Sequence, residues 1–469
     1  MTFSHVLFVL LLCVLTGSFT WGMRGTILGG ERGAMLPGAA LAMVLLFAGG
    51  SAPVAAAFPL AASIGAAGMF FGGSQTYGET IGMTKDADEK IRLMGQIGLA
   101  VKGAGWFGIF GGILGFGVGA MAGRYAIWET VLFVVFLPVM RILGALLINA
   151  PFAPKENVFP KFYFSKTRRE VWGGMLLTFV YILVFSACKR EWFTILLALF
   201  GFLFGALGFF TGNLLQNYAD AHLSDEWISG WKLMECTFGA IGAFGVGFCW
   251  CLFYGHFGSR YAYEIIAHSG AWSPLSDKAE TVLGFIWLVL LALFIARYWF
   301  PHPKGKKDDR LAKRLYGAED VLIWPLFCLV PLFLAAIGDA FFANLFCFFG
   351  MFYLLPDKIV FGGKKHFEKM PIAPVLHVGL IVVSAILLFV QLFLDAKPGA
   401  YAVWTLYTLG YLLVMLLITL DPIRVAALTR EHGSFKKAVL SIKTEPTWLA
   451  YAGVSVIALM VLGKFYFTL

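Results

Sequence analysis

The chain has 469 residues, of which 59% are hydrophobic and only 13% are charged. A soluble protein is about 45–50% apolar and about a quarter charged, so this composition excludes an ordinary water-soluble domain and favours a protein embedded in lipid. The net charge of +9 does not indicate a nucleic-acid partner, because the basic residues lie in loops between apolar segments, where they orient transmembrane helices.

Apolar segments long enough to cross a bilayer recur along the whole chain. A crossing takes about 20 mainly apolar residues. We therefore predict an all-α polytopic membrane protein with about fourteen transmembrane helices. They lie near residues 3–23, 34–50, 53–74, 96–122, 126–149, 170–188, 192–214, 233–255, 279–300, 319–337, 339–356, 372–394, 400–420 and 447–467. The second and third segments, and the tenth and eleventh, are joined by very short connections, so either pair could hold a re-entrant segment.

The first apolar segment, 3–23, resembles a signal peptide only superficially. No Lys or Arg precedes it and no small-residue cleavage site follows it, which favours retention as the first helix. Tryptophan and tyrosine near segment ends are typical of an aromatic belt at the membrane interface. The residues that we assign to this belt are Trp21, Tyr125, Trp128, Trp192 and Tyr298.

The distribution of basic residues predicts an orientation. Loops after odd-numbered segments carry several times more Lys and Arg than loops after even-numbered segments. Basic loops stay on the cytoplasmic side, so both termini are expected outside the cytoplasm, in a plasma or inner membrane. The lipid bilayer is thus the first expected partner. The seven cysteines are scattered, with neither a CxxC pair nor zinc spacing, and we predict no metal and no cofactor.

Two stretches resemble each other at an offset of about 130–140 residues, and similarity between helices rich in Phe and Gly could also arise by chance. The matches include Tyr77-x-Glu79 with Tyr218-x-Asp220. We predict a parallel repeat of two four-helix units, 1–125 and 126–255. The unit 1–255 would carry the polar site, and 256–469 would form a second bundle of about six transmembrane helices.

Glycines recur at helical spacing on the fourth and seventh segments, where small residues let helices approach closely. We favour this packing role over a role in lining a cavity. The glycines are Gly111, Gly115, Gly119 and Gly123 on the fourth segment, and Gly201, Gly205, Gly208 and Gly212 on the seventh.

Polar residues at the expected cytoplasmic ends are the candidates for function, because ionisable groups inside a membrane are costly. Arg24, Glu31 and Arg32 lie among glycines whose backbone N–H groups could bind an anion. The alternative is a short turn that contacts lipid headgroups. No phosphate-loop pattern is present.

A second candidate is the segment 72–80, which ends an apolar segment with hydrogen-bonding side chains before its acid. This composition suits a broken helix lining a polar site better than a solvent loop, although capping of a helix end is an equal alternative. Its functional residues are Gln75, Tyr77 and Glu79. The matching residues in the second copy are Asn213, Gln216, Asn217, Tyr218 and Asp220.

Three further ionisable residues lie within or beside apolar segments: Lys102, Arg141 and Glu235. Arg141 needs an acidic or carbonyl partner, and Glu129 is the nearest acid in its segment. Asp220, His222, Asp225 and Glu226 are close in sequence, but their spacing matches no metal motif, so we interpret them as a polar loop. His377 is interpreted as a core histidine rather than a proton relay.

The leading hypothesis is a transporter for a small polar or anionic solute, coupled to protons or sodium. Arg24, Arg32 and Lys102 would attract the solute, with Glu31 and Arg141 nearby. Gln75, Tyr77, Asn213, Gln216, Asn217 and Tyr218 would hydrogen-bond it, and Glu79, Asp220 or Glu235 would carry the coupling ion. The alternatives are a membrane-embedded enzyme acting on a lipid or lipid-linked sugar, with His222 in catalysis, and a structural membrane subunit.

Overall fold

The computed structural model describes residues 2–24, 30–49, 57–223, 229–268, 278–286 and 325–352, with a few single positions besides. Within these ranges the chain is helical, and the only β-type pairing is one isolated bridge between Ala153 and Val158. The predicted segments 372–394, 400–420 and 447–467 lie outside the described residues. So do Asp225, Glu226, Tyr298 and His377.

Helices occur where the sequence places its first eight apolar segments. They are α1 (Phe3–Met23), α2 (Gly30–Gly49), α4 (Phe58–Gly72), α6 (Glu89–Met121), α7 (Ile127–Ile148), α8 (Trp172–Cys188), α9 (Trp192–His222) and α10 (Gly230–His268). A short helix, α5 (Gly78–Met83), separates α4 from α6, and η2 (Pro154–Glu156) lies between α7 and α8. Further on come η3 (Pro325–Leu329), α13 (Val330–Ala336) and α14 (Ala340–Phe352).

Five of the helices in the described ranges are long and apolar enough to cross a membrane, namely α1, α6, α7, α9 and α10. The outward face of α7 is apolar along its whole length, which suits contact with lipid rather than water. Its exposed residues include Ile127, Trp128, Val131, Leu132, Val135, Phe136, Val139, Ile142, Leu146 and Leu147. These features fit a membrane-embedded protein. The total of about fourteen crossings, the two-copy repeat and the second bundle stay predictions.

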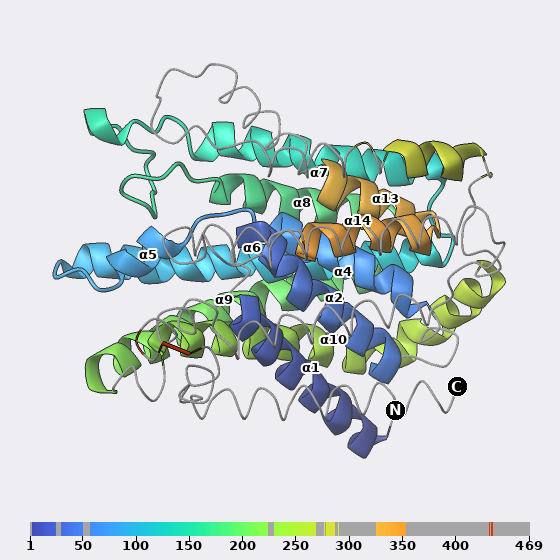
Figure 1. The fold of residues 1–469 in the computed structure, drawn as a ribbon, viewed down its shortest axis with the longest axis horizontal. Coiled ribbons are helices and arrows are strands. Elements are labelled where there is room, and N and C mark those ends of the chain that lie inside the picture. The colour runs from blue at the N-terminus through green and yellow to red at the C-terminus, as the bar shows by residue number, and fades with distance from the viewer. Residues whose placement is uncertain are drawn as a thin grey trace.

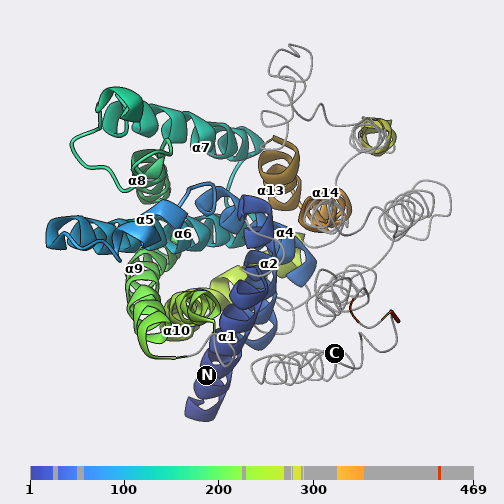
Figure 2. The ribbon, with the colours of Figure 1, turned by 60° about the vertical axis from the view of Figure 1, so that its left-hand side comes forward.

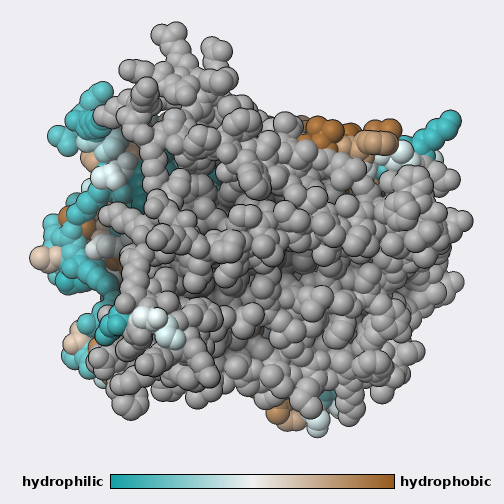
Figure 3. All heavy atoms as spheres, viewed as in Figure 1, coloured by the Kyte–Doolittle hydropathy of each residue, from teal (hydrophilic) through white to brown (hydrophobic). Residues whose placement is uncertain are grey.

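Several pairs of helices that follow one another in the chain pack antiparallel. In α2 and α4, for example, Ala34 lies against Gly73 while Ala42 lies against Gly65, so the two helices run in opposite directions. The connections 73–77 and 149–171 therefore gather at one end of the bundle, together with α5, the end of α9 and the start of α10 (Figure 1). We call this the polar end. In the space-filling view, hydrophilic side chains gather there (Figure 3).

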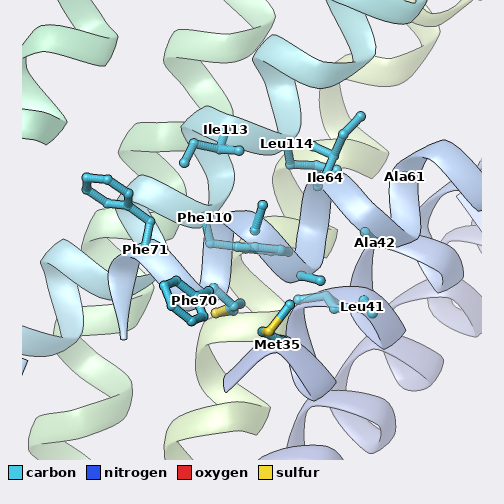
Figure 4. Packing of buried hydrophobic residues seen from close by; sticks show 14 of the residues in the cluster. Met35, Leu41, Ala42, Ala61, Ile64, Phe70, Phe71, Phe110, Ile113 and Leu114 are labelled. Carbon is cyan, nitrogen blue, oxygen red and sulfur yellow. The ribbon is translucent and has the colours of Figure 1, made fainter. Parts of the chain in front are cut away.

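Helix α6 is the central element of the bundle and lies between α8 and α9 (Figure 2). It begins where the Asp88 side chain accepts a hydrogen bond from the Lys90 backbone N–H at 2.8 Å. It ends just before Gly123, whose φ of 70° is the left-handed conformation that glycine adopts without steric cost. Close by, α2, α4 and α6 bury a layer of Met, Leu, Ile and Phe side chains (Figure 4).

Glycines bring α6 and α9 into backbone contact. A Cβ added at Gly205 would lie 2.3 Å from the carbonyl oxygen of Gly103, and one at Gly111 would lie 2.2 Å from that of Leu197. Gly208 and Gly212 face α10 instead, near Phe238 and Met234 respectively. The glycines of α9 therefore allow close contact with both α6 and α10. The predicted packing role is confirmed for the four glycines of α9 and for Gly111 and Gly115 of α6. It was wrong for Gly119, which faces Tyr125 in the following turn, and for Gly123, which lies beyond the end of α6.

The aromatic belt is only partly correct. Trp128 and Trp192 are 62% and 55% exposed, as a belt requires. Trp21, however, is fully buried, with its ring 4.8 Å from that of Trp106 in an edge-to-face contact. Tyr125 is also buried and stacks on Phe116. The belt prediction was wrong for these two residues, because other helices of the bundle cover their rings.

Candidate functional site

The break between α4 and α5 is the centre of the polar end. Helix α4 ends at Gly72 and α5 begins at Gly78, so residues 73–77 separate the two helices. The broken segment frees backbone carbonyls from helical pairing and turns successive side chains towards different helices. We call residues 74–80 the junction segment.

Tyr77 of the junction segment joins α1 to α10. Its hydroxyl accepts a hydrogen bond from the Arg24 guanidinium and donates one to Glu235 Oε1 at 2.6 Å. Arg24 also pairs directly with Glu235 Oε1 at 2.9 Å. The side chains of Arg24 and Glu235 are 2% and 1% exposed, so this is a fully desolvated ion pair with a phenol between its members. Three elements far apart in sequence meet here.

Aromatic rings enclose the guanidinium of Arg24. Its central carbon lies 5.1 Å from the ring centre of Trp21, 4.9 Å from that of Trp106 and 5.3 Å from that of Tyr77, within cation–π range. Trp231 of α10 stacks on Tyr77 at 5.7 Å. Two buried N–H groups here, Arg24 Nε and Trp21 Nε1, have no acceptor among the described residues. Buried donors usually have a partner, so this is an unusual feature.

Lys102 forms a second buried ion pair beside the first. Its ammonium group donates to Glu170, to the carbonyl oxygen of Thr76 at 2.6 Å and to the Thr80 hydroxyl at 2.6 Å. Lys102 and Glu170 are 1% and 3% exposed. Gln75 donates to the carbonyl oxygen of Lys102 at 2.8 Å. The junction segment thus surrounds the lysine and holds it against Glu170, just before α8.

The Glu79 side chain holds the connection between α7 and α8. Its carboxylate accepts hydrogen bonds from the Ser165 hydroxyl at 2.5 Å, the Thr167 backbone N–H at 2.8 Å and the Thr167 hydroxyl. Partial burial alone would raise the pKa of Glu79, but these hydrogen bonds outweigh it and hold the pKa at about 2. Glu79 is therefore ionised near neutral pH and fixes the connection 149–171 against α5.

Arg141 is hydrogen-bonded to the junction segment and is not paired with Glu129. Its guanidinium donates to Ser74 Oγ at 3.1 Å and to the Ser74 carbonyl oxygen at 3.3 Å. Glu129 instead pairs with Lys189 at 2.5 Å, at the opposite end of α7. Glu31 interacts electrostatically with both Arg24 and Arg141. Arg32, the next residue of α2, is half-buried.

Three amide side chains lie near the end of α9, towards the polar end. Asn213 and Gln216 are 1% and 3% exposed, and Asn217 donates to the Thr84 hydroxyl at 3.3 Å. Three of their polar atoms, Asn213 Nδ2, Gln216 Oε1 and Asn217 Oδ1, have no partner among the described residues. Phe209, one turn before Asn213, packs on the Tyr77 ring at 5.3 Å. The amides thus continue the surroundings of Tyr77 along α9.

The second Tyr-x-acid element does not join this centre. Tyr218 is 60% exposed and lies beside His222, and Asp220 pairs with Lys85 at the surface. Tyr77 and Tyr218 therefore occupy different environments. In the described ranges, no group of three histidine, cysteine or acidic side chains could hold a metal ion.

Sequence reasoning missed several residues of the site. Glu170, Trp106 and Trp231 contact candidate residues, yet none was singled out, and Thr80 was included in the candidate segment 72–80 without a role. Glu170 carried the clearest signal, because it is an acid at the first position of a predicted transmembrane segment. The contacts of Thr80 and of the tryptophans depend on how the helices pack, which the pattern of apolar residues does not specify.

Similarity to characterised proteins adds nothing to this geometry. No protein-family model, no curated protein and no solved structure matches the chain.

Proposed function

We propose that the chain is a secondary transporter for a small polar or anionic solute, driven by a coupled ion, in a plasma or inner membrane with both termini outside the cytoplasm. The observation that carries the proposal is the buried Arg24–Tyr77–Glu235 group at a helix break. The solute would bind among Arg24, Tyr77 and the α9 amides.

The placement of the charges supports transport. Burying an ion costs several kcal/mol, and stability alone is a weak reason to keep a buried ion pair, because well-packed apolar residues often serve as well. Two such pairs, Arg24–Glu235 and Lys102–Glu170, lie side by side on the junction segment. Ionisable groups in a membrane bundle commonly mark the path of a solute or proton.

The broken helix supports the same proposal. Transporters bind solutes where helices are interrupted, because unwound backbone offers polar groups that a continuous helix keeps paired. Within the junction segment, Tyr77 contacts both α1 and α10. Gln75 contacts α6, and Ser74 contacts α7. A movement of this one segment would therefore change the environment of both buried ion pairs described at the polar end.

The test is uptake by purified protein in liposomes, using a panel of radiolabelled amino acids, sugars and organic anions under proton and sodium gradients. We expect at least one solute to accumulate at least about tenfold above protein-free liposomes. Arg24→Leu should abolish that uptake, because it removes the solute's charged partner.

The matched control is Arg124→Leu. Arg124 pairs with the buried Glu191 at the far end of the bundle, so its loss has a comparable structural cost without touching the site. Uptake normalised to folded protein should survive Arg124→Leu. Equal uptake by Arg24→Leu and Arg124→Leu, or no uptake of any solute by the unsubstituted protein, would contradict the proposed function.

A further inference from the structure

The contacts of Arg24 indicate what kind of ligand it would take. One of its N–H groups is bound to the Glu235 carboxylate and to the Tyr77 hydroxyl, and its Nε–H is buried with no acceptor among the described residues. A guanidinium presents its donors in a flat fork that matches a carboxylate. The group that Arg24 already holds is itself a carboxylate.

We propose that the solute is a small monocarboxylate, which replaces Glu235 on Arg24 when Glu235 takes up a proton. This inference rests on the proposed function and names the solute class and the coupling ion for the same site. In the exchange, Glu235 gains one proton from water and becomes a neutral carboxylic acid. The solute carboxylate then forms the ion pair with Arg24, and release reverses both steps.

The charges that face the site limit the solute to one negative charge. Arg24 is balanced by Glu235 and Lys102 by Glu170. Glu31 of α2 interacts electrostatically with Arg24 and Arg141, and Asp220 of α9 is paired with Lys85. One protonation of Glu235 therefore frees one positive charge. Because an unpaired buried charge costs several kcal/mol, an anion is favoured on Arg24 only when Glu235 is neutral.

Further charged and titratable groups border Glu235 without replacing it in this role. Tyr77 is hydrogen-bonded to its Oε1 and can turn its hydroxyl to follow the proton. Lys232 lies one turn earlier on α10. From α9 the nearest buried polar side chains, Asn213 and Gln216, are uncharged.

The aromatic surroundings favour a carboxylate with a short apolar body. Trp21, Trp106 and Phe209 line the region around Arg24 and Tyr77, so a small hydrocarbon chain would meet ring faces there. The Nε1–H of Trp21 is buried and without an acceptor among the described residues, and it can donate to the second carboxylate oxygen.

The test is binding of acetate and propionate to the full chain in detergent between pH 6 and 8, followed by tryptophan fluorescence. Both probes are anionic throughout this range. If binding takes up one proton, the apparent Kd rises about tenfold for each pH unit above the pKa of Glu235. A pH indicator in weak buffer should record about one proton taken up for each probe molecule bound.

Glu235→Gln should bind both probes with an affinity that does not change with pH, because the amide imitates the protonated acid. Glu191→Gln removes a buried carboxylate that is 2% exposed at the far end of the bundle, and it should keep the pH dependence. No binding at pH 6, binding without proton uptake, or an unchanged pH dependence in Glu235→Gln would overturn the inference. If neither glutamine variant folds, the number of protons taken up by the unsubstituted protein on binding tests the inference.

These outcomes are separate from the test of transport. Uptake of a sugar or amino acid without carboxylate-linked proton binding would leave the proposed function standing and refute the solute class. Proton-linked carboxylate binding without uptake into liposomes would support the ligand class and refute the proposed transport.

Discussion

Lys102→Met is expected to lower the free energy of unfolding by about 3–5 kcal/mol, because removing one member of a buried ion pair leaves its partner charged and unsolvated. The stranded group is Glu170, whose side chain is 3% exposed and would keep one hydrogen bond among the described residues, from the Phe164 backbone N–H at 2.7 Å. Thermal unfolding in a fixed detergent, followed by tryptophan fluorescence, measures the loss.

The double variant Lys102→Met/Glu170→Gln should recover most of that stability. The amide introduced at position 170 would still accept from the Phe164 N–H without carrying a charge into the bundle. A double variant no more stable than Lys102→Met would show that the lysine acts through packing or through Thr76 and Thr80, and not through its charge.

Gly205→Ala is expected to lower stability by about 1–3 kcal/mol, the usual cost of forcing an extra methyl group into a tightly packed contact. The new methyl would lie 2.3 Å from the Gly103 carbonyl oxygen and 2.8 Å from the Phe107 side chain, so α6 and α9 would have to separate. Gly82→Ala is the control, since a Cβ there meets nothing within 4 Å.

At Gly82 the substitution should be neutral or stabilising by up to about 1 kcal/mol, because alanine favours helix over glycine. Both variants are compared by their midpoint of thermal unfolding in the same detergent. Equal midpoints for Gly205→Ala and Gly82→Ala would mean that the α6–α9 contact adapts readily.

The sequence predicted the helices well because apolar length is a direct physical signal. A bilayer-spanning helix has to be apolar over about 20 residues, and the first eight predicted segments correspond to α1, α2, α4 and α6 through α10. The glycine spacing likewise predicted close contact, because small residues repeated on one face of a helix let a neighbouring backbone approach.

The partners of the buried charges could not be predicted in the same way. For Arg141 the sequence predicted an acidic or carbonyl partner without saying which residue supplies it. The structure places the carbonyl and hydroxyl oxygens of Ser74 there, and it pairs Glu129 with Lys189. Ion pairs form between residues that packing brings together, and periodicity within one helix does not encode the neighbouring helix. Glu170 carried a sequence signal, as an acid at the start of a predicted segment, but nothing in the sequence indicated that it pairs with Lys102.

The two Tyr-x-acid elements of the predicted repeat also differ in their surroundings because of packing. Tyr77-x-Glu79 and Tyr218-x-Asp220 have the same spacing, yet Tyr77 lies in the bundle and Tyr218 on its surface. Tyr77 lies in a helix break, where its side chain turns inward, whereas Tyr218 continues α9 on its outer face. Equal spacing therefore does not produce equal surroundings when only one of the two segments is interrupted.

Transport at this site requires the buried polar groups beside the junction segment to open to water during function. The most direct test is labelling of Asn213→Cys by a membrane-impermeant thiol reagent, in a background where the exposed Cys188 is serine. Asn213 is 1% exposed here, so labelling requires an opening movement. We predict steady labelling that the transported solute slows, and none at Thr194→Cys, which is fully buried at the far end. Labelling of Asn213→Cys no faster than Thr194→Cys would contradict the claim.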